Sequence, residues 1–167
     1  LEKLRGIEKE VVAQYDLLQR LENKMVEDPN MPKEPYMPTF VRYEYIKSNL
    51  ISHTKRLEGI VKEHEDYLKQ FNETTDFLRK LRTELERFSD TTHSQKSQVE
   101  NKLLEMSGFS DSCSQADGLL KGTKELASVV VQNATSVDGK DAISQECHQL
   151  QFELDTLSAL LKDQQKS

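Results

Sequence analysis

The chain has 167 residues, of which 31% are charged and only 35% hydrophobic, and its mean hydropathy is −0.72. This composition gives much surface over little core, which is typical of helical bundles whose helices each bury one stripe. The 29 acidic and 23 basic residues are mixed along the chain and give a formal net charge of −6, which disfavours nucleic acid and anionic membranes as partners. No run approaches the ~18 apolar residues of a membrane span, so we expect no direct membrane insertion.

Residues 1–28 contain the first predicted helix. Its apolar residues recur at steps of four and three, interrupted only by Gln14, while Glu and Lys fill the other face. The start of the chain has no signal-peptide character and resembles a cut from something longer. The predicted helix stops at Pro29. Its apolar stripe consists of Leu4, Ile7, Val11, Leu18, Leu21 and Met25.

Residues 29–38 form a connector that holds all four prolines of the chain at a spacing of three. That spacing matches the three-residue turn of a polyproline II helix, so we expect an extended segment with its prolines on one edge. Two functions are open. The segment is either a PxxP ligand for an aromatic groove or a stiff connector that packs Met31, Tyr36 and Met37 against the bundle. We favour the connector because only Lys33 supplies a cation nearby.

The next stretch, residues 39–90, has no proline and one glycine, Gly59. Its apolar residues follow one another by alternating steps of four and three, which predicts a long helix with one heptad seam turned toward partner helices. His53, His64 and Thr74 fall on this seam. We expect them to be partly buried and to specify register, so that replacing both histidines with leucine raises thermal stability.

Two shorter helices are predicted over residues 96–134 and 140–166. The first of them contains several glycines and serines, which are poor helix formers, so tertiary packing must hold it. The predicted N-terminal caps are a Thr92 and Gln95 capping box for the first and Ser136 or Asp138 for the second.

The only cysteines, Cys113 and Cys147, fall on the apolar stripes of these two helices. In an antiparallel hairpin that turns near Ser136 they lie roughly 18 Å apart, which is too far for a disulfide. We therefore expect buried, reduced thiols, as in a cytosolic protein.

Site chemistry is missing from the sequence. No grouping of nucleophile, acid and base and no glycine-rich phosphate loop occurs. His53 and His64 are separated by about three helical turns and cannot bind one metal ion together. We expect no enzymatic activity, no metal and no other cofactor.

A family resemblance is carried by Tyr67-Leu68, Phe71 and Phe77-Leu78-Arg79-Lys80-Leu81, and by Ile143, Leu150 and Leu154. With the helical layout, these residues resemble the spectrin-repeat family over essentially the whole chain. In that family each repeat is a triple-helical bundle whose last helix runs into the first helix of the next repeat. Family members often carry tryptophan at the positions of Phe77 and Leu154, and this chain has none. It therefore resembles the divergent repeats of nesprins more than those of the dystrophin and plakin groups.

The resemblance implies an all-α fold: a spectrin-like antiparallel three-helix bundle plus part of the preceding repeat, joined by one long continuous helix. Residues 61–167 then form one complete repeat, and residues 1–60 supply the second and third helices of the repeat before it. The rod is expected to bend at Gly59. The implied repeat junction comprises Gly59, Ile60, Val61, His64, Tyr67 and Phe71. The implied bundle core comprises Phe77, Leu78, Leu81, Leu85, Val99, Leu103, Met106, Leu120, Ile143, Leu150, Leu154 and Leu157.

The implied repeat at residues 1–60 lacks its first helix, which leaves an apolar stripe uncovered. Either the sequence begins within a repeat, or an amphipathic helix of another polypeptide occupies this groove. The candidate protein-interaction residues are Leu4, Val11, Leu18, Leu21, Met31, Tyr36, Met37, Ile46 and Leu50.

By this resemblance the chain is a non-enzymatic, elongated spacer and docking segment of a large cytoskeletal linker. Implied partners are actin-associated or other cytoskeletal proteins and the neighbouring repeats of a parent chain, with force passed between cytoskeleton and nucleus. The implied location is cytoplasmic and cytoskeleton-associated, reaching the outer nuclear membrane through the parent protein. Two alternatives stay open: a BAR-like membrane-associated dimer, which needs a concave basic face, and a coiled-coil dimer, against which the predicted breaks between helices count.

Overall fold

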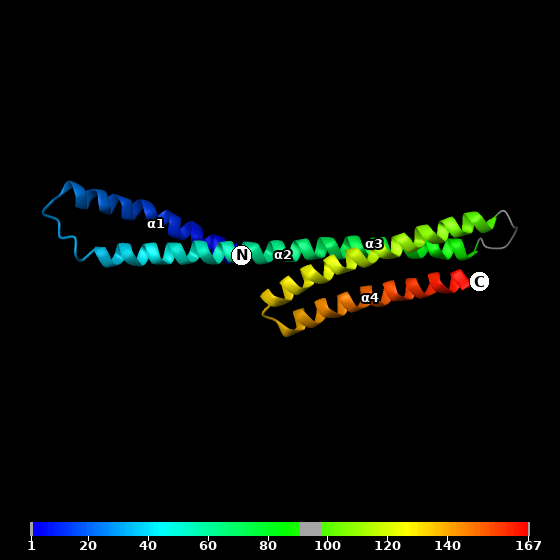
Figure 1. The fold of residues 1–167 in the computed structure, drawn as a ribbon. Coiled ribbons are helices and arrows are strands. Elements are labelled where there is room, and N and C mark those ends of the chain that lie inside the picture. The colour runs from blue at the N-terminus through cyan, green and yellow to red at the C-terminus, as the bar shows by residue number, and fades with distance from the viewer. Residues whose placement is uncertain (1, 91–97, 167) are drawn as a thin grey trace. The chain divides into compact units, whose positions relative to one another are not determined.

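The structure is a computed structural model that describes residues 2–90 and 98–166. It consists of four α-helices, and those residues contain no strand (Figure 1). The predicted all-α fold with one long continuous helix is confirmed. The predicted capping box at Thr92 and Gln95 lies outside the described residues. The helices are α1 (Glu2–Glu27), α2 (Met37–Asp90), α3 (Gln98–Asn133) and α4 (Val137–Lys166).

The chain divides into two compact units, unit 1 (Leu1–Val61) and unit 2 (Lys62–Ser167). Helix α2 contributes its first part to unit 1 and its remainder to unit 2, and it continues as α-helix through the boundary. Gly59, where we expected a bend, is helical and lies just before the boundary. Each unit has buried residues of its own.

Unit 1 is an antiparallel pair formed by α1 and the first part of α2. Arg5, near the start of α1, forms an ion pair with Glu58 at 3.3 Å. Further along α1, the Val11 carbonyl accepts a hydrogen bond from the Tyr43 hydroxyl at 3.0 Å. The contacting residues on α2 thus have lower residue numbers as those on α1 have higher ones, so the two helices are antiparallel. The buried residues of unit 1 are Met25, Leu50 and Thr54.

An aromatic cluster joins the two helices of unit 1. The rings of Tyr15 and Tyr43 stack with their centroids 6.3 Å apart. The Lys47 ammonium lies 5.1 Å from the centroid of the Tyr15 ring and 5.9 Å from that of Tyr43. Such cation–π contacts stabilise exposed sites by about 0.5–1 kcal/mol. Lys47 therefore stabilises unit 1 through its position over two rings as well as through its 3.6 Å ion pair with Glu44.

The connector between α1 and α2 differs from our prediction. A polyproline II helix has no internal hydrogen bonds, but here Met31 N–H donates to the Asp28 carbonyl and Tyr36 N–H to the Lys33 carbonyl, both at 3.1 Å. The predicted extended helix is therefore wrong, and the connector consists of turns. One cause is Asp28, whose carboxylate accepts a hydrogen bond from the backbone of Asn30 at 3.0 Å, as in an Asx turn. Pro38 lies in the first turn of α2, where a missing N–H is tolerated.

Unit 2 is a three-helix bundle of α2, α3 and α4, in which α3 and α4 lie side by side (Figure 1). Its larger core cluster contains Leu78, Leu81 and Leu85 of α2, packed with leucines of α4 and with Ala116 and Leu120 of α3. A smaller cluster consists of Tyr67, Ala127, Val130, Ile143 and Cys147. Because three helices enclose these clusters, unit 2 has a closed core.

Leu103 departs from the predicted bundle core. Its side chain is 63% exposed, so Leu103 lies outside the core. Val99 lies outside the residues whose side chains the structure describes. Phe77 packs half-buried against the larger cluster. The other residues predicted for the core are buried: Leu78, Leu81, Leu85, Met106, Leu120, Ile143, Leu150, Leu154 and Leu157.

The α3–α4 hairpin turns at the cap that the sequence indicates. The Ser136 hydroxyl accepts a hydrogen bond from the Gly139 N–H at 3.4 Å, so the prediction of Ser136 as an N-cap is confirmed. Asp138 lies in the first turn of α4, where a carboxylate interacts favourably with the helix dipole.

His53 and His64 are exposed, so our expectation of partly buried histidines is wrong. In unit 1, α1 packs on the stripe that includes Tyr43, Leu50 and Thr54. Ile46 lies beside that stripe, on the side of α2 that faces the solvent. His53 follows Ile46 by seven residues and therefore shares its exposed helical face. Thr74, in contrast, is completely buried in unit 2.

Candidate docking surfaces

An apolar groove runs between α1 and α2 in unit 1, with a volume of about 390 Å³. We call it the unit 1 groove. Leu18 and Leu21 are half-buried along it, while Leu17 is 58% and Ile46 43% exposed. A two-helix pair covers only part of each apolar stripe, so these side chains face solvent in the isolated unit. The lining residues are Gln14, Leu17, Leu18, Leu21, Thr39, Arg42, Tyr43 and Ile46.

The predicted protein-interaction residues do not all gather at this groove. Leu18, Leu21 and Ile46 line it, whereas Leu50 is buried at 8% exposure. Leu4, Val11, Met31 and Tyr36 are half-buried in unit 1. Leu17, which lies next to the predicted stripe, also lines the groove but was not predicted from the sequence.

A second apolar surface lies at the start of α2. We call it the α2 patch; it consists of Glu34, Met37, Pro38, Val41, Arg42 and Tyr45. Met37 is 52% exposed, Val41 66% and Tyr45 68%. Of these three, only Met37 was predicted from the sequence. The signal for the others was present, because residues four apart share a helix face, but it lay off the heptad seam.

The residues of the predicted repeat junction are divided between the units. Gly59, Ile60 and Val61 belong to unit 1, and Val61 is 41% exposed. The other three, His64, Tyr67 and Phe71, belong to unit 2. His64 is exposed beside Tyr67, with the ring centroids 6.2 Å apart, and the Phe71 ring lies 6.0 Å from that of Tyr67.

Tyr67 forms a buried polar contact that nothing in the sequence pattern predicted. It is 1% exposed, and its hydroxyl donates a hydrogen bond to the Glu146 carboxylate at 2.6 Å. Burial first, and then the hydrogen bond and charge of Glu146, raise the pKa of Tyr67 well above its ordinary value. A phenol held neutral in this way is a structural tie between α2 and α4, with no acid–base role at neutral pH.

Both thiols are free in the structure. Cys147 is buried beside Tyr67, and Cys113 is half-buried. Burial is the main cause that raises the pKa of each thiol above its ordinary value. A raised pKa lowers the thiolate fraction, so neither side chain has the character of a reactive cysteine.

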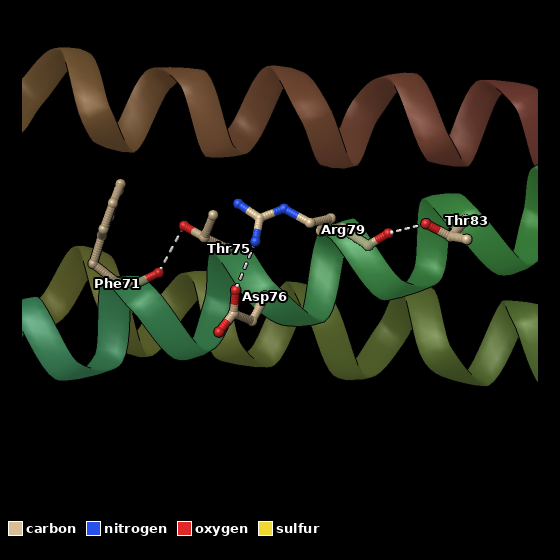
Figure 2. Close-up of polar contacts among 5 residues, drawn as sticks. All are labelled: Phe71, Thr75, Asp76, Arg79 and Thr83. Carbon is tan, nitrogen blue, oxygen red and sulfur yellow. Dashed lines mark hydrogen bonds and ion pairs between the residues drawn. The ribbon is translucent and has the colours of Figure 1, made fainter.

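Two arginines of α2 in unit 2, Arg79 and Arg82, are paired with carboxylates. Arg79 forms an ion pair with Asp76 at 3.0 Å (Figure 2), and Arg82 forms one with Glu153 of α4 at 3.2 Å. Figure 2 also shows the Thr75 and Thr83 hydroxyls donating to the carbonyls one turn earlier, at 2.8 and 3.0 Å. These local contacts leave no concentrated positive charge at Arg79 and Arg82 for an acidic partner.

Within residues 2–90 and 98–166, no group of His, Cys, Asp and Glu side chains is arranged to hold a metal ion. None of the described helices is long and apolar enough to cross a bilayer.

Comparison with known proteins gives two relatives. The chain is 28% identical over 167 residues to Muscle-specific protein 300 kDa of Drosophila melanogaster, which covers 100% of this chain and 1% of the relative. It is 30% identical over 130 residues to human Nesprin-2, which covers 75% of this chain and 2% of the relative. The chain thus spans a very small part of either relative. No family model matches the chain, and no solved structure matches it.

The helical architecture and these relatives indicate the class of protein that the chain resembles: it is an all-α segment that is similar to two spectrin-repeat giant proteins. Within that class its divergent repeats resemble those of nesprin-type giant cytoskeletal linkers, as the sequence indicated. Both relatives are giant cytoskeletal proteins, and the chain matches a very small part of each.

Proposed function

We propose that the chain is a non-enzymatic spacer and docking segment, and that the unit 1 groove binds an amphipathic helix. The observation that carries this proposal is the open groove itself. A spectrin-type repeat has three helices, whereas unit 1 has two. Leu17, Leu21 and Ile46 line the groove between these two helices, where a third helix would pack. A helix that buries these side chains gains about 25 cal/mol for each Å² of apolar surface removed from water.

The two units have different roles in this proposal. Residues 61–167 act as a complete repeat, because α2, α3 and α4 enclose a core in which Leu78 and Leu157 are 0% exposed. Residues 1–60 act as a partial repeat whose groove is completed by a further helix. The first unit is thus the docking element, and the second is the spacer.

The natural partners in this proposal are actin-associated or other cytoskeletal proteins, together with neighbouring repeats of a longer parent protein. The parent protein connects the cytoskeleton to the nuclear envelope, with this segment on the cytoplasmic side. Support comes from the nesprin-type resemblance and from the two structural cytoskeletal relatives.

The test uses the 167-residue chain fused to a fluorescent protein in cultured cells. Ile46→Glu places a charge in the unit 1 groove, and Leu68→Glu is the matched control, since these side chains are 43% and 42% exposed. We expect the wild-type chain and the control to concentrate on actin-rich structures and Ile46→Glu to become diffuse. Equal enrichment of all three chains would refute docking through the groove.

Hydrogen exchange tests the proposal that unit 2 is a complete repeat and unit 1 a partial one. We expect backbone amides near Leu78 and Leu120 in unit 2 to exchange more slowly than those near Leu18 and Ile46 in unit 1, because a closed three-helix core opens less readily than a helix pair. Equal protection in both units would show that unit 1 is complete without a third helix.

A further inference from the structure

The unit 1 groove carries a charge that bears on the kind of partner it fits. Among the described residues that line it, only Arg42 is charged, beside apolar side chains such as Leu17 and Ile46. Arg42 is exposed, and within residues 2–90 and 98–166 it forms no ion pair. Glu34 lines the α2 patch together with Arg42 but does not line the groove. A partner in the groove therefore meets a free guanidinium, whose planar shape matches a carboxylate.

A second cation lies at the same end of the groove. Lys24 follows Leu21 by three residues and so shares its face of α1. It lies in the last turn of α1, next to the connector, while Arg42 lies in the second turn of α2 on the other side of the connector. Lys24 is exposed and, in the part of the chain that the structure describes, forms no ion pair either. Both cations thus stand at the connector end of unit 1.

The carboxylates of α1 and the connector on this side leave the two cations available. Asp28 follows Lys24 by four residues, but its carboxylate accepts a hydrogen bond from the Asn30 backbone at 3.0 Å. Glu10 shares the groove face of α1, four residues before Gln14. It lies 14 residues before Lys24, which is roughly 21 Å along the helix and more than the Debye length of about 10 Å at 0.1 M salt.

We propose that the unit 1 groove selects an acidic amphipathic helix, whose carboxylates lie beside its apolar stripe and pair with Arg42 and Lys24. The stripe packs on Leu17, Leu21 and Ile46. The whole chain has a net charge of −6, so its long-range field favours a basic partner, and only the local cations of the groove favour an acidic one. This inference rests on the proposed docking in the groove and adds the charge of the partner.

Two synthetic peptides test the sign of that charge. Each has about 21 residues with leucine at the a and d positions of its heptads, and either glutamate or lysine at e and g, where charges flank the apolar stripe. Like charges at e and g also disfavour pairing of a peptide with itself. Calorimetric titration into the full chain, up to about 1 mM peptide at about 0.05 M salt, limits screening. We expect the glutamate peptide to bind about tenfold more tightly than the lysine peptide.

A charge reversal and its matched control assign this preference to the groove. Arg42→Glu is expected to abolish the preference for the glutamate peptide. Lys55→Glu changes the net charge equally at another exposed position of α2. Lys55 follows Ile46 by nine residues, so at about 100° per residue it lies on the opposite side of α2. We expect Lys55→Glu to retain the preference to within about twofold.

A second pair of variants tests docking itself, whatever the charge of the partner. Leu17→Ser removes a groove side chain that is 58% exposed, and Val12→Ser removes one that is 59% exposed elsewhere on α1. The two positions are five residues apart, or about 140° around the helix. We expect Leu17→Ser to weaken both peptides by about fivefold, because less apolar surface is buried, and Val12→Ser to weaken neither.

The possible results separate this inference from the proposed function. If the lysine peptide binds as tightly as the glutamate peptide, while Leu17→Ser weakens both, the groove docks helices but does not select acidic ones. Equal loss of the preference in Arg42→Glu and Lys55→Glu would also overturn the inference, since net charge would then explain it. If neither peptide binds up to about 1 mM, or if Leu17→Ser and Val12→Ser behave alike, docking in the groove and the acidic partner are both refuted.

Discussion

The hydroxyl oxygens of Thr74 and Thr123 lie 2.8 Å apart in the interior of unit 2, and both side chains are 0% exposed. Each oxygen also lies near a carbonyl one turn earlier: Thr74 is 2.9 Å from Gln70 O, and Thr123 is 3.0 Å from Leu119 O. Two hydroxyls have only two protons, so these three contacts cannot all be donated at once. One hydroxyl therefore donates to the other, and the pair ties α2 to α3 at one register.

The first prediction concerns this threonine pair. Thr74→Val or Thr123→Val alone is expected to lower the free energy of unfolding by about 1 kcal/mol, because the remaining hydroxyl can still donate to its own carbonyl. The double variant should cost less than the sum of the single ones, since no buried hydroxyl is then left without its partner. Urea denaturation of all four chains measures the coupling, and strictly additive effects would contradict the shared hydrogen bond.

The second prediction concerns the pH dependence that Tyr67 produces. The folded pKa of Tyr67 is raised above its ordinary value of 10.0, so the unfolded chain loses this proton first as the pH rises. The stability contribution of the neutral phenol is therefore complete below about pH 10 and is lost as the pH rises further. We expect the wild-type chain to be about 1 kcal/mol more stable than Tyr67→Phe at pH 8, with this advantage gone by about pH 11.

The measurement is thermal unfolding of both chains between pH 8 and pH 11. Cys113 is present in each chain, so its titration cancels in the difference. Cys147 is replaced by alanine in both chains, because a hydrogen bond with Tyr67 lowers the pKa of its thiol and its titration would not cancel. Tyr45→Phe is the control, because its ring is 68% exposed, and it should follow the wild-type curve. Parallel curves for the wild type and Tyr67→Phe would show that the phenol is not held neutral by the fold.

The sequence predicts the helices of this fold well because they depend on local and periodic signals. The proline connector ends α1, Ser136 caps α4, and the four-three rhythm extends through α2. The same rhythm is less reliable for burial. The rhythm placed His53 on the buried seam, whereas Thr54 is the buried residue. Two possible stripes run along this part of α2 and share residues such as Leu50, so periodicity alone did not show which stripe packs against α1.

The candidate surfaces were harder to predict for a different reason. Periodicity identified Leu18, Leu21 and Ile46 as members of an uncovered stripe, and these residues do line the unit 1 groove. It did not select Val41 and Tyr45 of the α2 patch, because these residues recur at a spacing of four but lie off the heptad seam. The Tyr67–Glu146 contact could not be predicted from the sequence either. These two residues lie far apart in the chain, and only the packing of α4 against α2 brings their side chains together.

The third prediction follows from Thr54. Its side chain is 6% exposed, and its hydroxyl oxygen has no hydrogen-bond partner in the described part of the chain. A buried hydroxyl without a partner is destabilising by about 1–3 kcal/mol. Thr54→Val should therefore raise the unfolding free energy of unit 1 by about 1 kcal/mol, while the neighbouring exposed His53→Leu should change it by less than about 0.5 kcal/mol.

Circular dichroism during urea titration, with exchange measured at unit 1 amides, separates the two substitutions. A stabilising effect of His53→Leu that exceeds that of Thr54→Val would restore the original heptad assignment and contradict the packing seen here.

The last prediction concerns Gly59, which lies inside α2 with no atom within 4 Å of the position that a Cβ would take. Gly59→Ala should stabilise unit 1 by about 0.5–1 kcal/mol, because alanine restricts the unfolded chain and meets no neighbour in the helix. Gly59→Pro removes a helical hydrogen bond and should destabilise the helix locally by about 3 kcal/mol or more. Since unit 2 begins at Lys62 and its buried residues begin at Tyr67, that loss should stay in unit 1. Hydrogen exchange resolved by residue is the measurement, and loss of protection around Leu78 in Gly59→Pro would show that the two units do not fold separately.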